Sequence, residues 1–281
     1  MKPKPKPIIG ILPIPIDQKE CGDSHIYYNY IKWFKNHDIA YTIIPSDCDN
    51  VSHVDGLFLP GNKVDVDLNT VYHRFCKRMF RLAIRENERG RYFPVWGTCL
   101  GFEQMVAIVA ADIGVLTRVD SEERRSAIKP YKSAPMSYLL QHIHIPKQVT
   151  YNHHLAISLG TFERDAKLSR FFRILGTSRD RNNKEYVATI EALHYPFYGV
   201  QWHPERTPGA NSIARFLKRE LEKGQIKRTK GTKKTRIRIS KRRPNHTIRR
   251  LCSKGHKNKD ERMCEIYKFR GAIKKGCEYD L

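Results

Sequence analysis

The sequence has no hydrophobic run long enough to cross a membrane as a helix. A membrane-spanning helix needs roughly 18 or more consecutive apolar residues, and the most apolar early run, residues 7–16, is interrupted by Pro13 and Pro15. We therefore expect no membrane-spanning segment and no membrane partner. The residues do not fix the compartment, but the lack of an evident signal peptide favours the cytoplasm or nucleus over a secreted or lysosomal location.

The cysteines show no sign of a disulfide framework. They number seven, which is odd, and they are scattered at Cys21, Cys48, Cys76, Cys99, Cys252, Cys264 and Cys277. We therefore expect mostly free thiols in a reducing compartment. Four residues near the C-terminus could be assembled into a zinc site, namely Cys252, His256, Cys264 and Cys277. Their spacings match no common zinc pattern, so we expect no metal.

Acidic residues are scarce relative to basic ones. Against 52 lysines and arginines the chain has 29 aspartates and glutamates, which gives a net charge of +23. Residues 223–281 hold 21 of the basic residues and 5 of the acidic ones, so most of the excess charge belongs to a tail. This tail lacks the interleaved aromatic residues of a base-stacking surface. It could bind nucleic acid or another polyanion through phosphate contacts, act as a nuclear-localisation run, or remain a solvated extension.

The chain divides into an arm, one domain and the tail. Its 281 residues are enough for one α/β domain of about 220 to 250 residues plus an appendage. Residues 1–6 alternate lysine with proline and predict an extended arm, residues 7–222 predict the compact domain, and residues 223–281 predict a basic, largely flexible tail.

Strand-like and helix-like patterns alternate in the first half of the domain. The strand patterns occupy residues 8–12, 40–44, 54–59, 93–97 and 197–202, and the helix patterns occupy residues 27–35, 71–87 and 211–223. Because strands that alternate with helices usually pair in parallel, this order predicts an α/β fold with a mostly parallel central sheet flanked by helices.

Residues 93–103 carry the strongest chemical signal. A buried-strand pattern runs through Gly97, Cys99 and Gly101 into a helical stretch over residues 104–111. Gly-x-Cys-x-Gly between a strand and a helix is typical of a nucleophile elbow, whose tight turn needs small flanking residues. The amide end of the helix would favour thiolate over thiol and so lower the pKa of Cys99. The alternative is that Cys99 is a small buried hydrophobe beside a tight turn.

A second motif supplies what such a nucleophile needs. A thiolate works with an imidazole as acid and base and with a third group that orients the ring. His203 and Glu205 are two positions apart at the end of a strand pattern, so both side chains project to the same face of an extended segment. Alone, the two could be an ordinary surface pair. Their significance comes from their occurrence together with the cysteine motif.

Together these segments resemble the γ-glutamyl hydrolases, or folate polyglutamate hydrolases, which are relatives of the class I glutamine amidotransferase domains. The resemblance rests on residues 7–12, 56–61, 93–103 and 199–205 and extends over about residues 7–222. It implies a class I glutamine amidotransferase-like fold with the basic tail as a C-terminal extension.

The resemblance also implies a reaction and its residues. The chain would be a cysteine hydrolase that cleaves γ-glutamyl amide bonds, of folate poly-γ-glutamates, through a thioester and without a cofactor. Cys99 would be the nucleophile, His203 the general base and acid, and Glu205 the residue that orients His203. The expected partner is a small-molecule poly-γ-glutamyl substrate, and a homodimer stays open.

The same resemblance assigns residues around the scissile bond. The backbone N–H groups of Leu100 and Asn62 would form the oxyanion hole. Asn62 stands where the family has a glycine, and asparagine is the non-glycine residue that most readily adopts a positive φ. Gly61, Glu103 and His154 would contact the substrate, although the segment that contains His154 could instead be an exposed polar loop.

Two other functions stay open. In a glutaminase-type amidotransferase domain the residue four positions after the cysteine is typically glutamine, whereas this chain has Glu103. A catalytically retired scaffold that binds anions or nucleic acid would not need Cys99, His203 and Glu205, all of which are present. Both comparisons favour the hydrolase.

Overall fold

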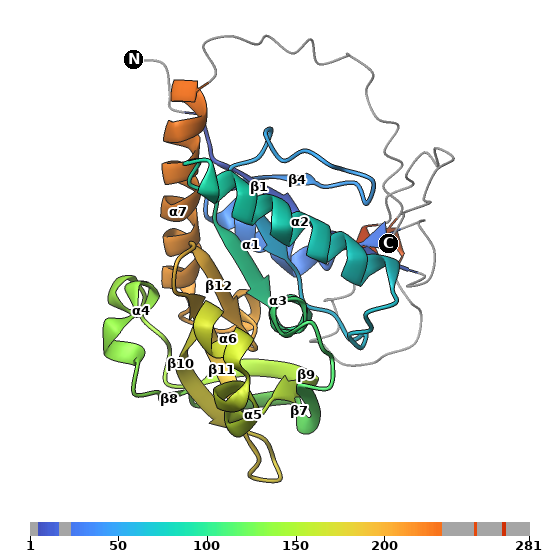
Figure 1. Cartoon of the computed structure of the whole chain (residues 1–281), viewed down its shortest axis with the longest axis vertical. Helices are drawn as coiled ribbons and strands as arrows, with labels where there is room; N and C mark the ends of the chain where they lie inside the picture. Colours follow the sequence, from blue (N-terminus) through green and yellow to red (C-terminus); the bar gives the residue numbers. More distant parts are fainter. Residues whose placement is uncertain (1–4, 17–23, 232–249, 252–265, 268–281) are drawn as a thin grey trace.

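One mixed sheet of eight strands organises the fold (Figure 1). The computed structural model describes residues 5–16, 24–231, 250–251 and 266–267. Across the sheet the strands are β4 (Ala40–Ile43), β1 (Ile8–Ile11), β5 (Gly56–Leu59), β6 (Val95–Thr98), β12 (Phe197–Val200), β11 (Glu185–Ala192), β10 (Phe172–Arg179) and β8 (Lys129–Pro130). Neighbouring strands from β4 to β12 are parallel, and those from β12 to β8 are antiparallel.

The remaining described strands form three small antiparallel pairs. The longest pair, which we call the β7–β9 ribbon, joins β7 (Leu116–Ser126) to β9 (Val149–Ile157). The two others are β2 (Ile14–Pro15) with β3 (Ser24–His25), and β13 (Arg250–Leu251) with β14 (Ile266–Tyr267).

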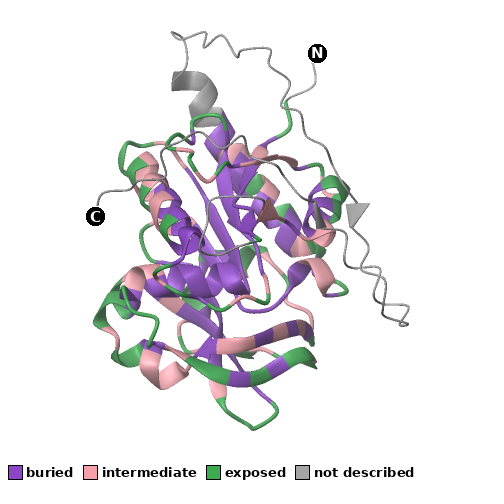
Figure 2. Cartoon of the chain, turned by 90° about the vertical axis from the view of Figure 1, so that its right-hand side faces the viewer, coloured by how far each residue is buried: buried purple, intermediate pink, exposed green. Residues whose placement is uncertain are grey.

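Helices cover both faces of the sheet. Among the described residues they are α1 (Tyr28–Asn36), α2 (Val71–Glu88), α3 (Leu100–Ala110), α4 (Tyr138–His142), α5 (Leu159–Arg164), α6 (Ala166–Phe171) and α7 (Asn211–Gly231), with 3₁₀ turns at Ala134–Met136 and Pro204–Arg206. Buried residues concentrate in the sheet and on the inner faces of these helices (Figure 2).

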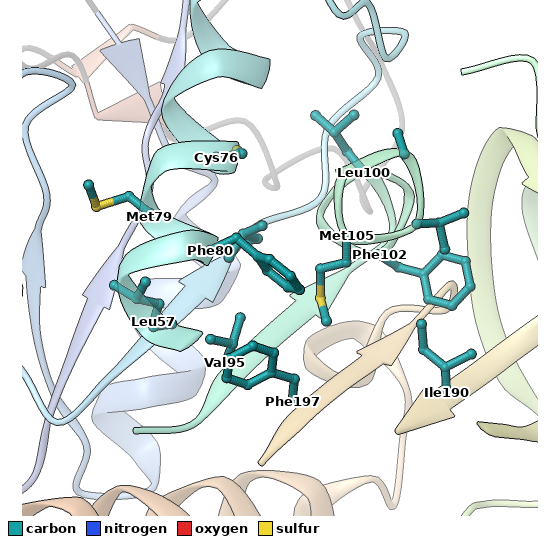
Figure 3. Packing of buried hydrophobic residues seen from close by; sticks show 14 of the residues in the cluster. Leu57, Cys76, Met79, Phe80, Val95, Leu100, Phe102, Met105, Ile190 and Phe197 are labelled. Carbon is teal, nitrogen blue, oxygen red and sulfur yellow. The ribbon is translucent and has the colours of Figure 1, made fainter. Parts of the chain in front are cut away.

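Successive strand residues enter two different cores because side chains alternate between the faces of a sheet. In β5, Leu57 joins a cluster that α2 and α3 cover (Figure 3). The next residue, Phe58, joins the opposite cluster, where its ring lies 5.0 Å from the ring of Phe34 in α1. Nearly every residue of the central strands is therefore apolar, as buried parallel strands require.

The α2 helix forms because one of its faces is apolar and its first turn is capped. Thr70 precedes the helix, and its hydroxyl accepts a hydrogen bond from the His73 N–H at 3.1 Å. The residues that α2 buries are Val71, Tyr72, His73, Phe75, Cys76, Met79, Phe80 and Ala83. Its outer face is left to polar and charged residues.

The predicted α/β sheet is confirmed, with three differences in detail. The antiparallel strands and the β7–β9 ribbon have no counterpart in the sequence patterns. The helix after Cys99 begins at Leu100, earlier than the predicted residue 104. The last helix continues to Gly231, beyond the predicted end at residue 223. Gly224 lies inside it at a close approach, since a Cβ there would lie 2.7 Å from the Tyr92 carbonyl oxygen.

Several sequence predictions fall on residues that the structure does not describe. They concern most of the N-terminal arm, most of the basic tail, and the zinc candidates Cys252, His256, Cys264 and Cys277. Of the cysteines in the described ranges, Cys48, Cys76 and Cys99 are free.

Candidate active site

Cys99 sits on a strained turn between β6 and α3. Its backbone has φ 52° and ψ −111°, a conformation that L-residues rarely adopt and that costs about 1 to 3 kcal/mol. The flanking glycines make the turn feasible, since a Cβ at Gly101 would lie 2.0 Å from the Leu59 carbonyl oxygen and one at Gly97 would lie 2.6 Å from the Met105 sulfur. The chain therefore adopts the elbow geometry that its sequence suggests.

The pKa of Cys99 departs from the prediction. Burial raises it well above the ordinary value, and the nearby Glu103 carboxyl raises it further. The Leu100 N–H lowers it as expected, but this single amide does not offset burial at a side chain that is 1% exposed. The predicted net lowering is wrong, so Cys99 is a thiol that needs a base to remove its proton.

His203 and Glu205 form a buried pair after β12. The His203 Nδ1 atom lies 2.7 Å from Glu205 Oε1. The two side chains are 8% and 2% exposed, so the contact is shielded from water. The His203 Nε2 atom is also buried, and it makes no hydrogen bond to any described residue. A ring held at Nδ1 with an unpaired Nε2 has the arrangement of a general base.

Cys99 and His203 meet at Gly61, which lies directly after β5. A Cβ placed on Gly61 would lie 2.9 Å from Cys99 Cβ and 3.0 Å from His203 Cε1. Both side chains therefore border the same point, although 104 positions separate them in the printed sequence. The carboxyl ends of the parallel strands β5, β6 and β12 bring the three residues together, as open α/β sheets do at their ligand sites.

Tyr30 of α1 matches the tyrosine-rich first helix of the resembled family, but it was not among the predicted site residues. Its hydroxyl accepts a hydrogen bond from the Gly61 N–H at 2.9 Å and lies 3.5 Å from His203 Nδ1. Burial raises the pKa of this hydroxyl well above its ordinary value, so it stays protonated. Tyr30 lies 173 positions from His203 along the chain, so no local spacing pointed to it.

Of the two predicted oxyanion donors, the Leu100 N–H is directed at the Cys99 sulfur, whose pKa it lowers. Leu100 opens α3, where helix geometry leaves the first N–H groups without partners inside the helix. Asn62 follows Gly61, and its side-chain amide lies 2.7 Å from His25 Nε2. Asn62 is absent from the described non-glycine residues with positive φ, which are Asp38, Cys99, Ala111, Glu123 and Asn183. The chain thus follows this turn without the positive φ that asparagine would permit.

Glu103 lies one turn into α3 and is buried. Its Oε1 accepts a hydrogen bond from Gln201 Nε2 at 2.7 Å. Burial raises the pKa of this carboxyl to about 8, with a smaller opposite contribution from Gln201. Glu103 is therefore mostly neutral near pH 7 and can donate as well as accept a hydrogen bond.

His154 lies in β9, so the exposed-loop alternative for its segment is wrong. Its Nε2 contacts Asp65, and its Nδ1 lies 3.5 Å from Glu122 Oε1 in β7. The neighbouring Asn152 carbonyl accepts a hydrogen bond from the Cys99 thiol at 3.7 Å. The β7–β9 ribbon thus covers the cysteine.

A cavity of about 10 Å³ lies between the loop after β5 and the ribbon. Its lining includes Asn62, Glu103, Glu122, Asn152 and His154, so two of the three predicted substrate residues, Glu103 and His154, border one space, whereas Gly61 does not line it. The volume is about that of a single water molecule. Within the described residues, no group of three or more His, Cys, Asp or Glu side chains is placed to hold a metal ion.

Comparison with known proteins identifies the family. A family model described as glutamine amidotransferase class-I matches residues 19–222. "Gamma-glutamyl hydrolase B" of Dictyostelium discoideum is 30% identical over 220 residues, which are 72% of this chain and 63% of that protein. The Bos taurus "Gamma-glutamyl hydrolase" is also 30% identical over 220 residues, which are 72% of this chain and 68% of that protein. The chain belongs to the γ-glutamyl hydrolase family.

The predicted family is therefore confirmed. The chain spans 63% of the length of the first relative and 68% of the second. No helix within the described ranges is long and apolar enough to cross a membrane.

Solved structures agree with the fold of this chain. The glutaminase domain of Trypanosoma brucei CTPS superposes with a TM-score of 0.56 over 79% of this chain and 94% of that domain, at 13% identity. A putative GMP synthase subunit from Thermoplasma acidophilum superposes with a TM-score of 0.53 over 81% of this chain and 98% of that one, at 17% identity. At such identities the likeness concerns the fold alone.

Proposed function

We propose that this chain hydrolyses γ-glutamyl amide bonds by cysteine catalysis, with folate poly-γ-glutamates as its substrate class. One observation carries the proposal: Cys99 and His203 border the same point at Gly61, and Glu205 holds the far side of the His203 ring at 2.7 Å. The named relatives supply the bond type, since they are γ-glutamyl hydrolases.

The first half of the reaction forms a thioester. His203 Nε2 takes the proton of the Cys99 thiol, and the sulfur attacks the γ-carbonyl carbon. The carbonyl oxygen becomes an oxyanion that the N–H groups of Leu100 and Asn62 stabilise, each donor contributing about 3 to 4 kcal/mol in comparable enzymes. The C–N bond then breaks while His203 returns its proton to the departing amine.

The second half consumes water. His203 removes a proton from a water molecule that attacks the thioester carbon, the C–S bond breaks, and His203 reprotonates the sulfur. The sum of both halves is an amide and water giving an acid and an amine. Each proton transfer passes through His203, which explains why Glu205 must hold its ring in one tautomer.

Substrate entry requires the β7–β9 ribbon to move. The cavity of about 10 Å³ cannot hold a γ-glutamyl group, since it accommodates about one water. Cys99 is itself covered by the Asn152 carbonyl of β9. We propose that the ribbon shifts away from the loop after β5, and that Gly61, Glu103 and His154 then contact the substrate.

An assay with two substrates tests the proposal. Purified full chain is offered a pteroylpoly-γ-glutamate or free glutamine, and glutamate release is measured for wild type and Cys99→Ala. Cys76→Ala is the matched control, because Cys76 is also fully buried but lies in α2. We expect polyglutamate hydrolysis that Cys99→Ala abolishes and Cys76→Ala preserves. Turnover of glutamine alone would favour the amidotransferase, and hydrolysis that survives Cys99→Ala would contradict the mechanism.

A further inference from the structure

The solvent-facing side of α2 carries a row of cations, which we call the α2 basic stripe: Arg74, Lys77, Arg81, Arg85 and Arg89. Consecutive members are three or four positions apart, and this spacing places them on one face of a helix. All are exposed except Lys77, which is half-buried. At 1.5 Å per residue the row extends over about 22 Å.

The acidic residues of α2 are Glu86 and Glu88, both near its C-terminal end. Arg74, Lys77, Arg81 and Arg85 form no ion pair with a described residue, and Arg89 lies 3.8 Å from Glu86, which also pairs with Arg91 at 2.6 Å. Like charges at i,i+4 destabilise an isolated helix. A helix that only needed a solvated face would alternate the two signs, so this arrangement suggests an anionic partner.

The chemistry of the stripe favours a phosphate backbone over a lipid or an apolar protein surface. The exposed large hydrophobic residues in the described ranges are Ile16, Ile113, Met136, Tyr138 and Leu193, and none lies in α2. A membrane-surface helix needs such residues to insert. Four of the five stripe residues are arginine, whose planar guanidinium binds phosphate oxygens in pairs.

The stripe ends close to the origin of the basic tail. Tyr92 follows α2 by four residues, and its carbonyl oxygen lies 2.7 Å from the position that a Cβ on Gly224 of α7 would take. After this point the sequence continues with residues 226–250, which contain 12 lysines and arginines and no acidic residue. Two dense runs of positive charge therefore start from the same end of the domain.

We propose that the α2 basic stripe is a docking surface for the phosphodiester backbone of double-stranded nucleic acid, a function separate from γ-glutamyl hydrolysis. A duplex presents one negative charge per about 1.7 Å of its axis, so a stretch of this length carries about 13 phosphates on its two strands, and those on one side can face the row. Side chains that contact only phosphates fix position without reading bases. Binding is therefore sequence-independent and falls steeply with salt.

Fluorescence anisotropy of a labelled DNA duplex of about 20 base pairs, titrated with full chain between about 50 and 200 mM salt, tests the stripe. The variant is Arg81→Gln/Arg85→Gln/Arg89→Gln. Since each phosphate contact contributes about 0.9 to the slope of log K against log salt, we expect the slope to become shallower by about 2 to 3. The variant Arg81→Lys/Arg85→Lys/Arg89→Lys keeps the charges and should retain most of the slope.

A charge-matched control separates the stripe from net charge. Lys35→Gln/Lys129→Gln/Lys147→Gln removes three exposed cations from other elements, and we expect its slope to change by less than about 1. Circular dichroism and thermal unfolding verify that each variant is folded. If the slope falls equally in both triple variants, the attraction depends only on net charge. If the slope of the stripe variant is unchanged, the tail and not the stripe binds the duplex. Either result overturns the proposal.

Two competing polyanions complete the test. Vesicles of phosphatidylcholine and phosphatidylserine, and poly-γ-glutamate of matched charge concentration, are titrated against wild type and the Arg→Gln triple. We expect the triple to lose duplex binding more than either of these interactions. A loss confined to vesicles would assign the stripe to a membrane surface, and a loss confined to poly-γ-glutamate would assign it to the substrate.

Discussion

His203 Nδ1 lies 2.7 Å from Oε1 of Glu205, with only Pro204 between the two residues. The contact gives Nδ1 a proton to donate and leaves the lone pair on Nε2, so it decides which nitrogen can serve Cys99. Nε2 has no hydrogen-bond partner among the described residues, so none of these residues competes for its lone pair.

Replacing the carboxylate at 205 tests this assignment. Glu205→Gln keeps the shape of the side chain but can donate to Nδ1 and so favour the wrong tautomer. We expect kcat to fall by about 10² to 10⁴-fold with little change in KM, as in related triads. Steady-state kinetics on a γ-glutamyl substrate measures this, with the exposed Glu163→Gln as control. Full activity in Glu205→Gln would remove Glu205 from the mechanism.

Glu103 predicts a pH dependence of activity, because burial raises the pKa of this carboxyl to about 8. Above that pH its negative charge raises the pKa of the Cys99 thiol further, so proton transfer to His203 becomes less favourable. We expect kcat to decline as the pH rises through 8, and Glu103→Gln to lose that decline. The measurement is the pH dependence of kcat for both proteins. An identical decline above pH 8 in the two proteins would contradict this role of Glu103.

The same carboxyl predicts a pH dependence of stability. Below pH 4.5, its ordinary pKa, Glu103 is protonated in the folded and unfolded chains alike. Between 4.5 and about 8 only the folded chain keeps the proton, so the free energy of unfolding decreases as the pH rises through this window. The free energy of unfolding of Glu103→Gln, relative to that of wild type, should therefore rise by about 2 to 4 kcal/mol from pH 5 to pH 8. Urea titrations at both pH values measure the free energy of unfolding of the two proteins. An equal difference between the proteins at pH 5 and at pH 8 would contradict the prediction.

Tyr30 should matter more for catalysis than an ordinary buried tyrosine. Tyr30→Phe leaves the buried Gly61 N–H without its acceptor, at a cost of about 1 to 3 kcal/mol of stability. It also frees the turn that carries Asn62 beside Cys99, so we expect kcat to fall by about tenfold. Tyr72→Phe is the matched control, since Tyr72 is also buried but lies in α2. Equal kinetics in the two variants would leave Tyr30 a purely structural residue.

The sequence predicted the parallel half of the sheet because its strands are apolar and end at clear turn signals. The antiparallel half gives no such signal. β7 reads Leu-Thr-Arg-Val-Asp-Ser-Glu-Glu-Arg-Arg-Ser, in which charge masks the alternation, and its pairing with β9 is a tertiary effect. Burial of Cys99 was equally hidden, because the Asn152 carbonyl that covers it comes from 53 positions away.

The site residues also fall into those that the sequence predicted and those that only the fold reveals. Cys99, His203 and Glu205 belong to short motifs, so their positions were readable along the chain. Tyr30 becomes a neighbour of Gly61 only when α1 packs on the sheet, and Gln201 a neighbour of Glu103 only when β12 pairs with β6. The predicted compartment, the homodimer and nucleic-acid binding by the tail stay predictions.

Gly61→Ala gives the sharpest test of how Cys99 and His203 meet. The new Cβ would lie 2.7 Å from the Tyr30 hydroxyl and 2.9 Å from Cys99 Cβ, closer than van der Waals contact permits, so these groups must separate. A displacement of about 1 Å in a reacting pair can cost about 10²-fold in rate, and overpacking costs about 1 to 3 kcal/mol. Kinetics and thermal unfolding are compared with Gly160→Ala, whose Cβ would meet only the flexible end of Arg164. Wild-type kcat in Gly61→Ala would show that this close approach is not needed for turnover.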